Sequence, residues 1–472
     1  MSAIFSGQEL TAASGGKWLP ALPAAEAVFS IATDSRRDCT GTLFLALKGE
    51  NFDGHNCLAQ ALERGAAALC VESPHAEEAA ALGVPVLVVG STMKAYHNIA
   101  RFHRLRFKDL TVIGLTGSVG KTSVKEMLRA ICTAACDGNG DAVLATPGNR
   151  NNHFGVPDTL LMLTENHRYA VIEMGTSGPG EIAVLTEMVE PDVALVNSIA
   201  ACHLERLKTL DGVALEKSQI FSALKPAGIG VIPADSPGHN ILKAALPVRR
   251  RMEFGHGGTV DYRYLGGNLS GSAVMLKFPD GREYELIWRL SGEHQAVNAS
   301  AAATAGVALG LSPETILKGL ANTELPGMRM NVIKCNGANW ILDAYNANPE
   351  SMRAALSWLS DFTEPDKTLV ILGDMLELGA SEQLEHYHIL AELVRRLPDA
   401  AVILVGAAMS NAAGLLPPSL QEKWQTFESS EAAATAVAAT VHPGWNILVK
   451  GSRGIMLEKA VPEEVKRCAD GR

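Results

Sequence analysis

The chain has 472 residues, of which 47% are hydrophobic and 19% charged. This length suits about three ordinary globular domains of ~150 residues each. Lys and Arg number 41 against 51 Asp and Glu, and the net charge of −10 argues against nucleic acid or an anionic membrane as the main partner. The N-terminus lacks the features of a signal peptide, and no apolar run reaches the ~18 residues of a membrane span. We therefore expect a soluble, cytoplasmic protein whose eight scattered cysteines are reduced thiols.

The N-terminal region, residues 1–92, mixes short apolar runs with glycine-rich turns. The runs at 66–71 and 84–89 have the length of buried strands, so the region predicts a small α/β domain. From 93 to 107 a helical pattern leads to a further strand at 110–115.

The most distinctive segment of the chain follows that strand and opens a helix with one apolar face. Glycines let the backbone N–H groups turn toward an anion, the helix N-terminus adds partial positive charge, and Lys121 adds a full one. The common nucleotide loop has an earlier glycine where Leu115 stands here, so a purely structural glycine-rich turn remains the alternative. The segment predicts a phosphate-binding loop made of Gly117, Ser118, Val119, Gly120, Lys121, Thr122 and Ser123.

Further strand patterns follow the loop at 169–172 and 193–196, separated by helical patterns. This alternation is typical of a parallel sheet covered by helices, and it defines a central domain at 93–323. Between about 245 and 290, turn signals and alternating segments predict an antiparallel insertion. After a Pro-Gly break at 325–327, four apolar runs alternate with helices up to residue 449, which predicts a doubly wound, Rossmann-like domain at 324–472.

Polar residues placed just after the strands mark the edge where parallel sheets bind ligands. Glu173 ends one predicted strand, and His203 follows the next by a few residues. Taken singly, such a Glu more often caps a loop and such a His is usually just hydrogen-bonded. Their joint occurrence after a phosphate loop favours metal ligands beside nucleotide phosphates.

Five segments then occur in a specific order. They lie at 116–122, 173–175, 201–205, 292–298 and 343–349. Together they resemble the Mur ligases, the ATP-dependent amide-forming enzymes of peptidoglycan synthesis, whose short phosphate loop also lacks the first glycine. The resemblance implies a UDP-muramoyl-peptide-binding domain at 1–92, an ATP-binding P-loop domain at 93–323 and a C-terminal Rossmann-like domain at 324–472.

Other segments narrow the resemblance to one branch of the family. Residues 33–55 are similar to the UDP-sugar-binding front domain of the third and fourth ligases of the pathway, and segments at 147–157, 372–379 and 450–454 resemble the D-Ala-D-Ala-adding branch. The resemblance implies that ATP drives the joining of D-Ala-D-Ala to UDP-N-acetylmuramoyl-tripeptide through an acyl phosphate. The preceding, single-amino-acid-adding ligase and a nucleotide-dependent switch or binding protein remain alternatives.

The same resemblance implies four catalytic residues and two magnesium ions. Lys121 would bridge the β- and γ-phosphates, while Thr122 and Glu173 hold one ion. His203 and Lys217, the latter as a carbamate, would hold the second, because an unmodified lysine cannot ligate a metal. Carbon dioxide adds only to a neutral amine, so this role requires a lowered pKa at Lys217. A solvated lysine on a helix is the alternative.

The remaining site residues are also assigned by resemblance. Asn298 would bind the adenine edge, with a helix-start cap as its alternative, and His294 would be a structural neighbour rather than a base. Ser198, Gln219 and Gln295 depart from the usual family residues near the second metal. The expected partners are the two substrates, with no nucleic acid and no membrane insertion, and the expected state is a monomer. The nucleotide would also meet Arg329, Asp343 and Tyr345, and the UDP-substrate would meet Ser35, Arg36, Lys48, Asn149, Asn151 and Asn152.

Overall fold

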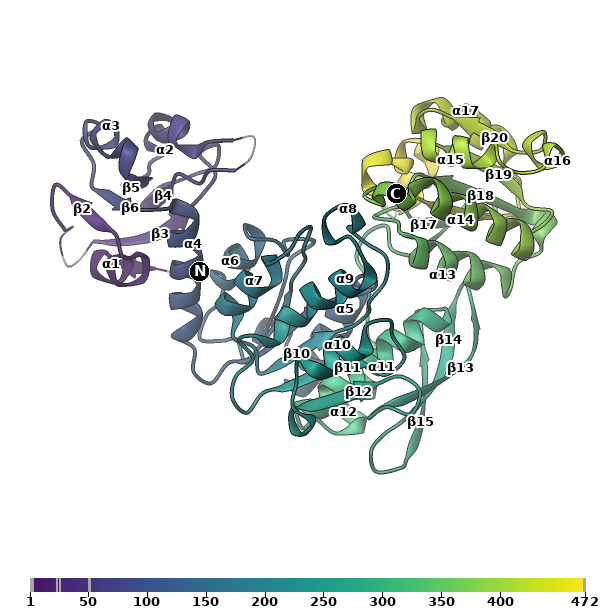
Figure 1. Ribbon diagram of the computed structural model, residues 1–472, viewed down its shortest axis with the longest axis horizontal. Coiled ribbons are helices and arrows are strands. Elements are labelled where there is room, and N and C mark those ends of the chain that lie inside the picture. The colour runs from purple at the N-terminus through teal and green to yellow at the C-terminus, as the bar shows by residue number, and fades with distance from the viewer. Residues whose placement is uncertain (1–3, 23, 25–26, 50–51, 470–472) are drawn as a thin grey trace. The chain divides into compact units, whose positions relative to one another are not determined.

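The computed structural model describes residues 4–22, 24, 27–49 and 52–469 (Figure 1). It divides into two compact units. The first holds residues up to 114 together with 140–174 and 183–192, and the second holds 115–139, 175–182 and 193–472. Within the described residues, no helix has the length and apolar character that crossing a membrane would require.

The N-terminal region folds around one mixed sheet of six strands. The inner pairs run parallel, whereas the outer pairs β1–β3 and β2–β6 are antiparallel. The predicted apolar runs at 66–71 and 84–89 form the neighbouring inner strands β5 and β6. Across the sheet the order is β1 (Phe5–Ser6), β3 (Val28–Ala32), β4 (Thr42–Leu45), β5 (Ala68–Glu72), β6 (Val86–Val89) and β2 (Lys17–Leu19).

Helices cover this sheet, and two apolar clusters form between them. The last helix begins after Ser91, whose hydroxyl accepts the Lys94 N–H, so the predicted helix at 93–107 is confirmed. The helices are α1 (Gly7–Ser14), α2 (Leu58–Glu63), α3 (Ala76–Ala80) and α4 (Thr92–Leu105).

A second six-stranded sheet carries the phosphate loop. Its three strands predicted from sequence are all present, and the pairs β10–β11, β11–β12 and β8–β9 run parallel. Its order is β12 (Arg251–Phe254), β11 (Ile229–Pro233), β10 (Val193–Val196), β7 (Thr111–Thr116), β9 (Tyr169–Glu173) and β8 (Val143–Ala145).

The helix after the phosphate loop, α5, packs closely against α11 and α12. A Cβ on Gly319 of α12 would lie 2.4 Å from the Ile131 Cα of α5, so only glycine allows this approach. The helices that follow β7 are α5 (Lys121–Ala135), α6 (Gly155–Leu160), α7 (Glu181–Val189), α8 (Leu204–Leu207), α9 (Leu210–Ser218), α10 (His239–Ala244), α11 (Glu293–Ala308) and α12 (Pro313–Ala321).

The predicted antiparallel insertion is confirmed, but it begins later than expected. Its strands are β13 (Asp261–Asn268), β14 (Gly271–Lys277) and β15 (Glu283–Trp288), which form a three-stranded antiparallel sheet. The expected start near residue 245 is wrong, because β12 at 251–254 pairs in parallel with β11. A short strand shows the same side-chain alternation in either sheet, so sequence alone does not assign it.

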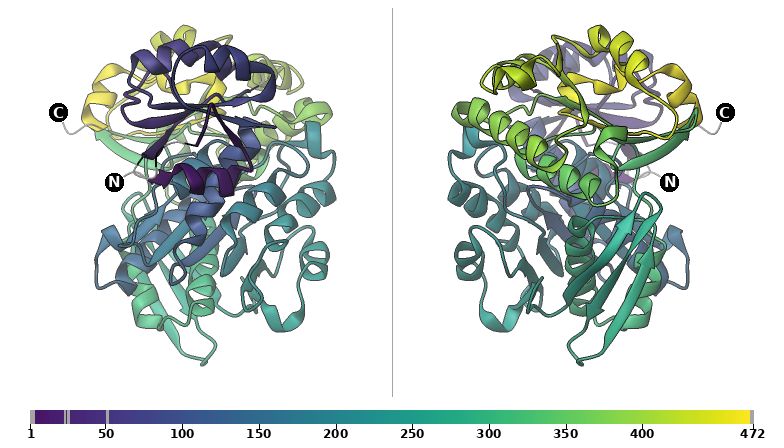
Figure 2. Two further views of the ribbon diagram at one scale, coloured as in Figure 1. Left: turned by 90° about the vertical axis from the view of Figure 1, so that its left-hand side faces the viewer. Right: turned by 90° about the vertical axis from the view of Figure 1, so that its right-hand side faces the viewer.

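The C-terminal region is doubly wound, as predicted. Figure 2 shows helices on both faces of its sheet, and alternate strand residues feed two separate apolar clusters. All neighbouring strands run parallel except the β16–β17 pair at one edge. The order is β16 (Asn331–Cys335), β17 (Ala338–Asp343), β21 (Asn446–Lys450), β18 (Thr368–Gly373), β19 (Ala401–Val405) and β20 (Gln425–Phe427).

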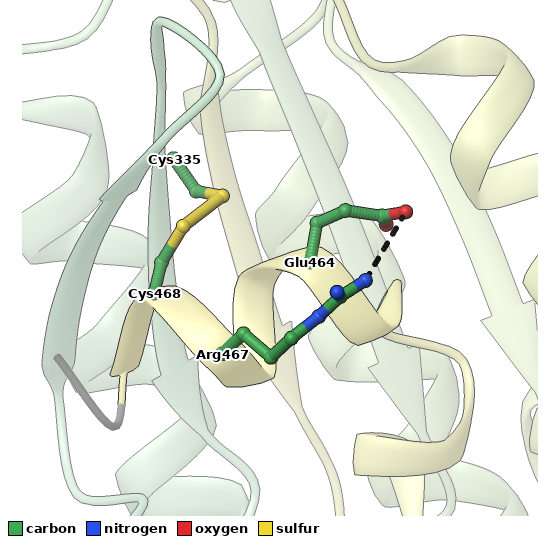
Figure 3. Close-up of a disulfide and its surroundings, with 4 residues drawn as sticks. All are labelled: Cys335, Glu464, Arg467 and Cys468. Atoms are coloured by element: carbon green, nitrogen blue, oxygen red, sulfur yellow. Dashed lines mark ion pairs between the residues drawn. A yellow bond between two sulfur atoms is a disulfide. The ribbon is translucent and has the colours of Figure 1, made fainter. Parts of the chain in front are cut away.

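A disulfide connects two elements of this region. It joins Cys335 of β16 to Cys468, next to an ion pair between Glu464 and Arg467 (Figure 3). The expectation of reduced thiols is therefore wrong for this pair, whose partners lie 133 residues apart in sequence. The helices here are α13 (Pro349–Ser360), α14 (Glu382–Arg396), α15 (Ala407–Ala413), α16 (Pro418–Gln421), α17 (Ser430–Thr440) and α18 (Glu463–Ala469).

Candidate active site

The phosphate loop connects β7 to α5, as the sequence predicts. The Lys121 ammonium donates a hydrogen bond to the Gly117 carbonyl at 2.8 Å, so the lysine folds back over its own loop. Gly120, at the helix start, has a left-handed backbone with φ of +78°. The positive helix end, the loop N–H groups and Lys121 are groups of the kind that attract an anion.

Both glycines are required by close neighbours. A Cβ on Gly117 would lie 1.5 Å from the Asn197 Oδ1, and one on Gly120 would lie 2.6 Å from the Asn298 Oδ1. These distances are far below van der Waals contact. The loop glycines therefore serve the packing of the site as well as its conformation.

Two polar residues just beyond β10 hold the loop in place, and sequence reasoning missed this role. The Asn197 amide donates to the Val119 carbonyl at 2.5 Å. The Val119 N–H donates to the Ser198 hydroxyl at 2.8 Å, and that hydroxyl lies 2.9 Å from the Val119 carbonyl. Their position directly after a buried strand is the signal that could have identified them.

Lys217 and the residue that precedes His203 both lie near the loop. The Cys202 sulfur, next to His203, lies 3.2 Å from the hydroxyl of the loop residue Ser118. Lys217, on α9, is 1% exposed, so the alternative of a solvated lysine is wrong. Its pKa falls from 10.5 to about 8, chiefly because burial removes the ammonium from water; Cys202 opposes this and Lys121 adds to it.

His203 contacts a carboxylate from the C-terminal region. Its Nδ1 lies 2.5 Å from the Glu377 Oε2, and the histidine lowers the pKa of that carboxyl. His203 also has a left-handed backbone, with φ of +51°. Sequence reasoning did not single out Glu377.

Glu173 ends β9 with a buried carboxylate, 2% exposed. Its Oε1 accepts a hydrogen bond from the Asn151 amide at 2.8 Å, and its N–H donates to the Thr146 hydroxyl. Asn151 and Glu173, assigned separately from sequence, thus lie together. Asn152 has a different task, because its side chain accepts the N–H groups of Phe154 and Gly155. The remaining member of this predicted group, Asn149, is exposed.

Asn298 lies beside the phosphate loop, within the second turn of α11. Its amide donates to the Gln295 side chain at 3.2 Å. Gly292 is the residue that caps α11, so the alternative role of Asn298 as a helix-start cap is wrong. His294 is partly buried and its pKa falls to about 4, mainly through loss of hydration, so it stays neutral at physiological pH.

The three predicted nucleotide residues of the C-terminal region form one cluster. The Arg329 guanidinium stacks over the Tyr345 ring at 3.8 Å. Asp343 accepts the Met330 N–H at 3.3 Å, which ties it to the linker that carries Arg329. The buried Lys450 donates to the other oxygen of Asp343 at 2.5 Å.

The three candidate UDP-binding residues of the N-terminal region each contact another polar side chain. Ser35 is buried and donates to the Gln60 side chain at 2.6 Å. Arg36 pairs with Asp34 and Lys48 with Asp53, yet both cations remain more than half exposed. Their charges are thus still accessible to an anion in water.

Asp53, His55 and His75 also gather in this domain, at distances that a metal ion could bridge. The His55 Nδ1 lies 2.6 Å from the Asp53 carboxylate, however, and its Nε2 accepts the Glu72 N–H at 3.0 Å. Because both ring nitrogens are engaged, the arrangement is a hydrogen-bonded support for the loop at 53–57.

Three family models match the chain in order. The model "Mur ligase family, catalytic domain" matches residues 28–104, "Mur ligase middle domain" matches 115–306, and "Mur ligase, glutamate ligase domain" matches 328–453. These spans cover most of the chain and include the phosphate loop.

Individual ligases of this family are similar to the chain over nearly its whole length. The chain is 34% identical to the UDP-N-acetylmuramoyl-tripeptide–D-alanyl-D-alanine ligase of Bacillus subtilis (strain 168), over 93% of both chains. A crystal structure of MurF from Acinetobacter baumannii is 33% identical, with a TM-score of 0.89 over 98% of this chain and 99% of that one. MurF of Thermotoga maritima in complex with ADP is 25% identical, with a TM-score of 0.76 over 94% of this chain and 99% of that one. The chain therefore belongs to the Mur ligase family and is an ATP-dependent amide-bond-forming ligase with the three-domain architecture of that family.

Proposed function

We propose that this enzyme joins D-Ala-D-Ala to UDP-N-acetylmuramoyl-tripeptide, producing UDP-muramoyl-pentapeptide, ADP and phosphate. The relatives that match over nearly the whole chain bear the name of this reaction. The observation that supports this chemistry is the phosphate loop with Lys121, whose positive charge helps to lower the pKa of the buried Lys217.

The reaction has two steps. The terminal carboxylate of the tripeptide attacks the γ-phosphorus of ATP, a P–O bond forms, and ADP leaves. The dipeptide amine then attacks the acyl carbon, phosphate leaves with the C–O electron pair, and the amine loses a proton. Both reactants of the first step are anions, so catalysis depends mainly on cations and positioning.

Lys121 supplies the first cation. On nucleotide binding its ammonium would exchange the Gly117 carbonyl for the β- and γ-phosphate oxygens. The loop N–H groups would hold the same phosphates, while Asn197 and Ser198 keep the loop from moving. Asn298, next to Gly120, is assigned to the adenine edge.

The donor set fits two magnesium ions, which would supply positive charge to the phosphates and the carboxylate. Thr122 and Glu173 would hold the first, with Asn151 fixing the Glu173 carboxylate. His203 and Lys217 would hold the second. Lys217 fits as a carbamate: its lowered pKa leaves a sizeable fraction of neutral amine, whose nitrogen adds carbon dioxide and loses a proton.

The remaining assignments complete the proposal. Arg329, Asp343 and Tyr345 serve the nucleotide, Ser35, Arg36 and Lys48 serve the UDP group, and Asn149, Asn151 and Asn152 serve the muramoyl-peptide. We place the domain boundaries at 92/93 and 323/324. The enzyme acts as a cytoplasmic monomer, with neither nucleic acid nor membrane insertion involved.

The test is phosphate release from ATP with UDP-muramoyl-tripeptide, with and without D-Ala-D-Ala. Strict dependence on both substrates is expected. Turnover with lysine or diaminopimelate in place of the dipeptide, on a UDP-muramoyl-dipeptide, would favour the single-amino-acid-adding ligase. Nucleotide binding with no phosphate release under any combination would instead favour a switch protein.

A further inference from the structure

Glu377 lies in the loop that follows β18, and the backbone on its N-terminal side is firmly held. The Met375 N–H donates to the His386 Nε2 at 2.9 Å, and the Leu376 N–H donates to the Ser452 hydroxyl at 3.0 Å. His386 is itself fully buried. The two residues before Glu377 are therefore anchored to separate parts of the C-terminal region.

The backbone at this contact is unusual on both sides. Glu377 has φ of +65° and His203 has φ of +51°, and neither is glycine. Residues with a Cβ adopt this left-handed conformation at a cost in energy, and such residues concentrate at functional sites. Here two of them present their side chains to each other.

The contact between the two side chains is close. The His203 Nδ1 lies 2.5 Å from the Glu377 Oε2, while 58% of the Glu377 side chain remains exposed. The neighbouring segments also approach, because a Cβ on Gly379 would lie 3.4 Å from the Glu205 Cα. The Nδ1 nevertheless has no hydrogen bond of regular angle among the described residues, so the pair is in contact but not fully aligned. Hydrogen bonds of this kind commonly tighten when the ligand binds.

We propose that Glu377 is a positioning residue for His203: its carboxylate takes the hydrogen bond of Nδ1–H and so leaves the Nε2 lone pair for the metal ion. This inference rests on the proposed role of His203 as a magnesium ligand. A neutral imidazole carries one proton, and the partner of one nitrogen decides which nitrogen is free to ligate. Metal-binding histidines are usually fixed by such an outer carboxylate or carbonyl.

Through Glu377 the C-terminal region would contribute to the metal site of the central domain. Glu377 reaches His203 from a different sheet, and the arginine, aspartate and tyrosine of the nucleotide cluster come from the same C-terminal region. The second metal site is then complete only while this contact is made.

The experiment measures Mn²⁺ binding by electron paramagnetic resonance in the presence of a non-hydrolysable ATP analogue and bicarbonate. The variants are E377A, E377Q, H203A and, as the matched control, E382Q, which removes the same charge from an exposed position on α14. We expect E377A to lower the Mn²⁺ affinity of the site that contains His203 roughly 10- to 100-fold. E377Q keeps an oxygen acceptor, so its Mn²⁺ affinity should fall less. The Mn²⁺ affinity of E382Q should match that of the wild type. Thermal unfolding of each variant verifies that it is folded.

A second measurement separates this role from binding of the incoming amine. If Glu377 orients His203, excess metal restores kcat in E377A and leaves KM for D-Ala-D-Ala close to the wild-type value. Wild-type Mn²⁺ affinity in E377A, or a change confined to KM for the dipeptide, would overturn the inference. If Mn²⁺ binding is lost in H203A but kept in E377A, the proposed metal role of His203 stands and the positioning role of Glu377 fails. If H203A binds Mn²⁺ like the wild type, both roles fail.

Discussion

Replacing Lys217 with methionine should stabilise the folded protein while it abolishes ligation. Lys217 is buried, and its pKa lies at about 8 instead of 10.5. At ~1.4 kcal/mol per pH unit, the difference between these two pKa values corresponds to a free-energy cost of about 3 kcal/mol for keeping the buried amine protonated. Below pH 8 the amine is protonated in both states, so the folded chain bears this whole cost. Methionine has a similar length and no charge, and it removes the cost.

The stability gained by Lys217→Met should depend on pH. Between pH 8 and 10.5 the unfolded chain keeps the proton that the folded chain has lost, so the contribution of Lys217 to wild-type stability rises with pH over this range. The advantage of Lys217→Met should therefore be largest at pH 7, up to about 3 kcal/mol, and should shrink toward pH 10.5.

The assay is thermal unfolding in buffers freed of carbon dioxide, so that no carbamate forms. A change of 1 kcal/mol moves the melting temperature of a domain of this size by roughly 2–4 °C. Lys318→Met, at an exposed position of α12, is the matched control and should change little. A variant at Lys217 that melts earlier at pH 7, or that gains equally at pH 7 and 10.5, would refute the reasoning.

Three further changes have expected outcomes. Gly117→Ala places a methyl group on the Asn197 amide and should weaken binding of an ATP analogue at least about 10-fold by calorimetry; wild-type affinity would contradict the loop geometry. Lys450→Met leaves the Asp343 carboxylate without its buried cation and should lower the free energy of unfolding by about 3 kcal/mol in urea, since a broken buried pair costs ~3–5 kcal/mol. Cys468→Ser opens the bond to β16 and should cost about 2–4 kcal/mol of stability with kcat unchanged, and the same loss should follow reduction of the wild type. An equal melting temperature for reduced and oxidised wild type would contradict this last expectation.

Local sequence signals predicted the parts of the fold that depend on nearby residues. The phosphate loop was found because glycines, Lys121 and the flanking strand and helix occur within a short stretch. The strands of the doubly wound sheet were found because buried parallel strands form continuous apolar runs. The assignment of Lys217 came from family resemblance, and its burial and lowered pKa agree with the chemistry required of it.

Other features depend on where distant segments meet, and sequence reasoning missed them. Neither Cys335 nor Cys468 has a local pattern that pairs them across 133 residues. Glu377 lies in the segment 372–379 that resembles the family, but its contact with His203 exists only once the fold brings the two together. The edge strand β12 was misassigned because pairing direction is a property of the sheet, not of a four-residue segment.

The hydrogen bond from Lys121 to its own loop has a consequence for nucleotide choice. Before any nucleotide arrives, one of the three N–H groups of the ammonium already donates to the Gly117 carbonyl. A nucleotide phosphate can take the hydrogen bonds of the other N–H groups, but only if the phosphate chain is long enough to reach the ammonium. We therefore expect the loop to discriminate by the length of the phosphate chain, favouring di- and triphosphates over a monophosphate that shares the same base and sugar.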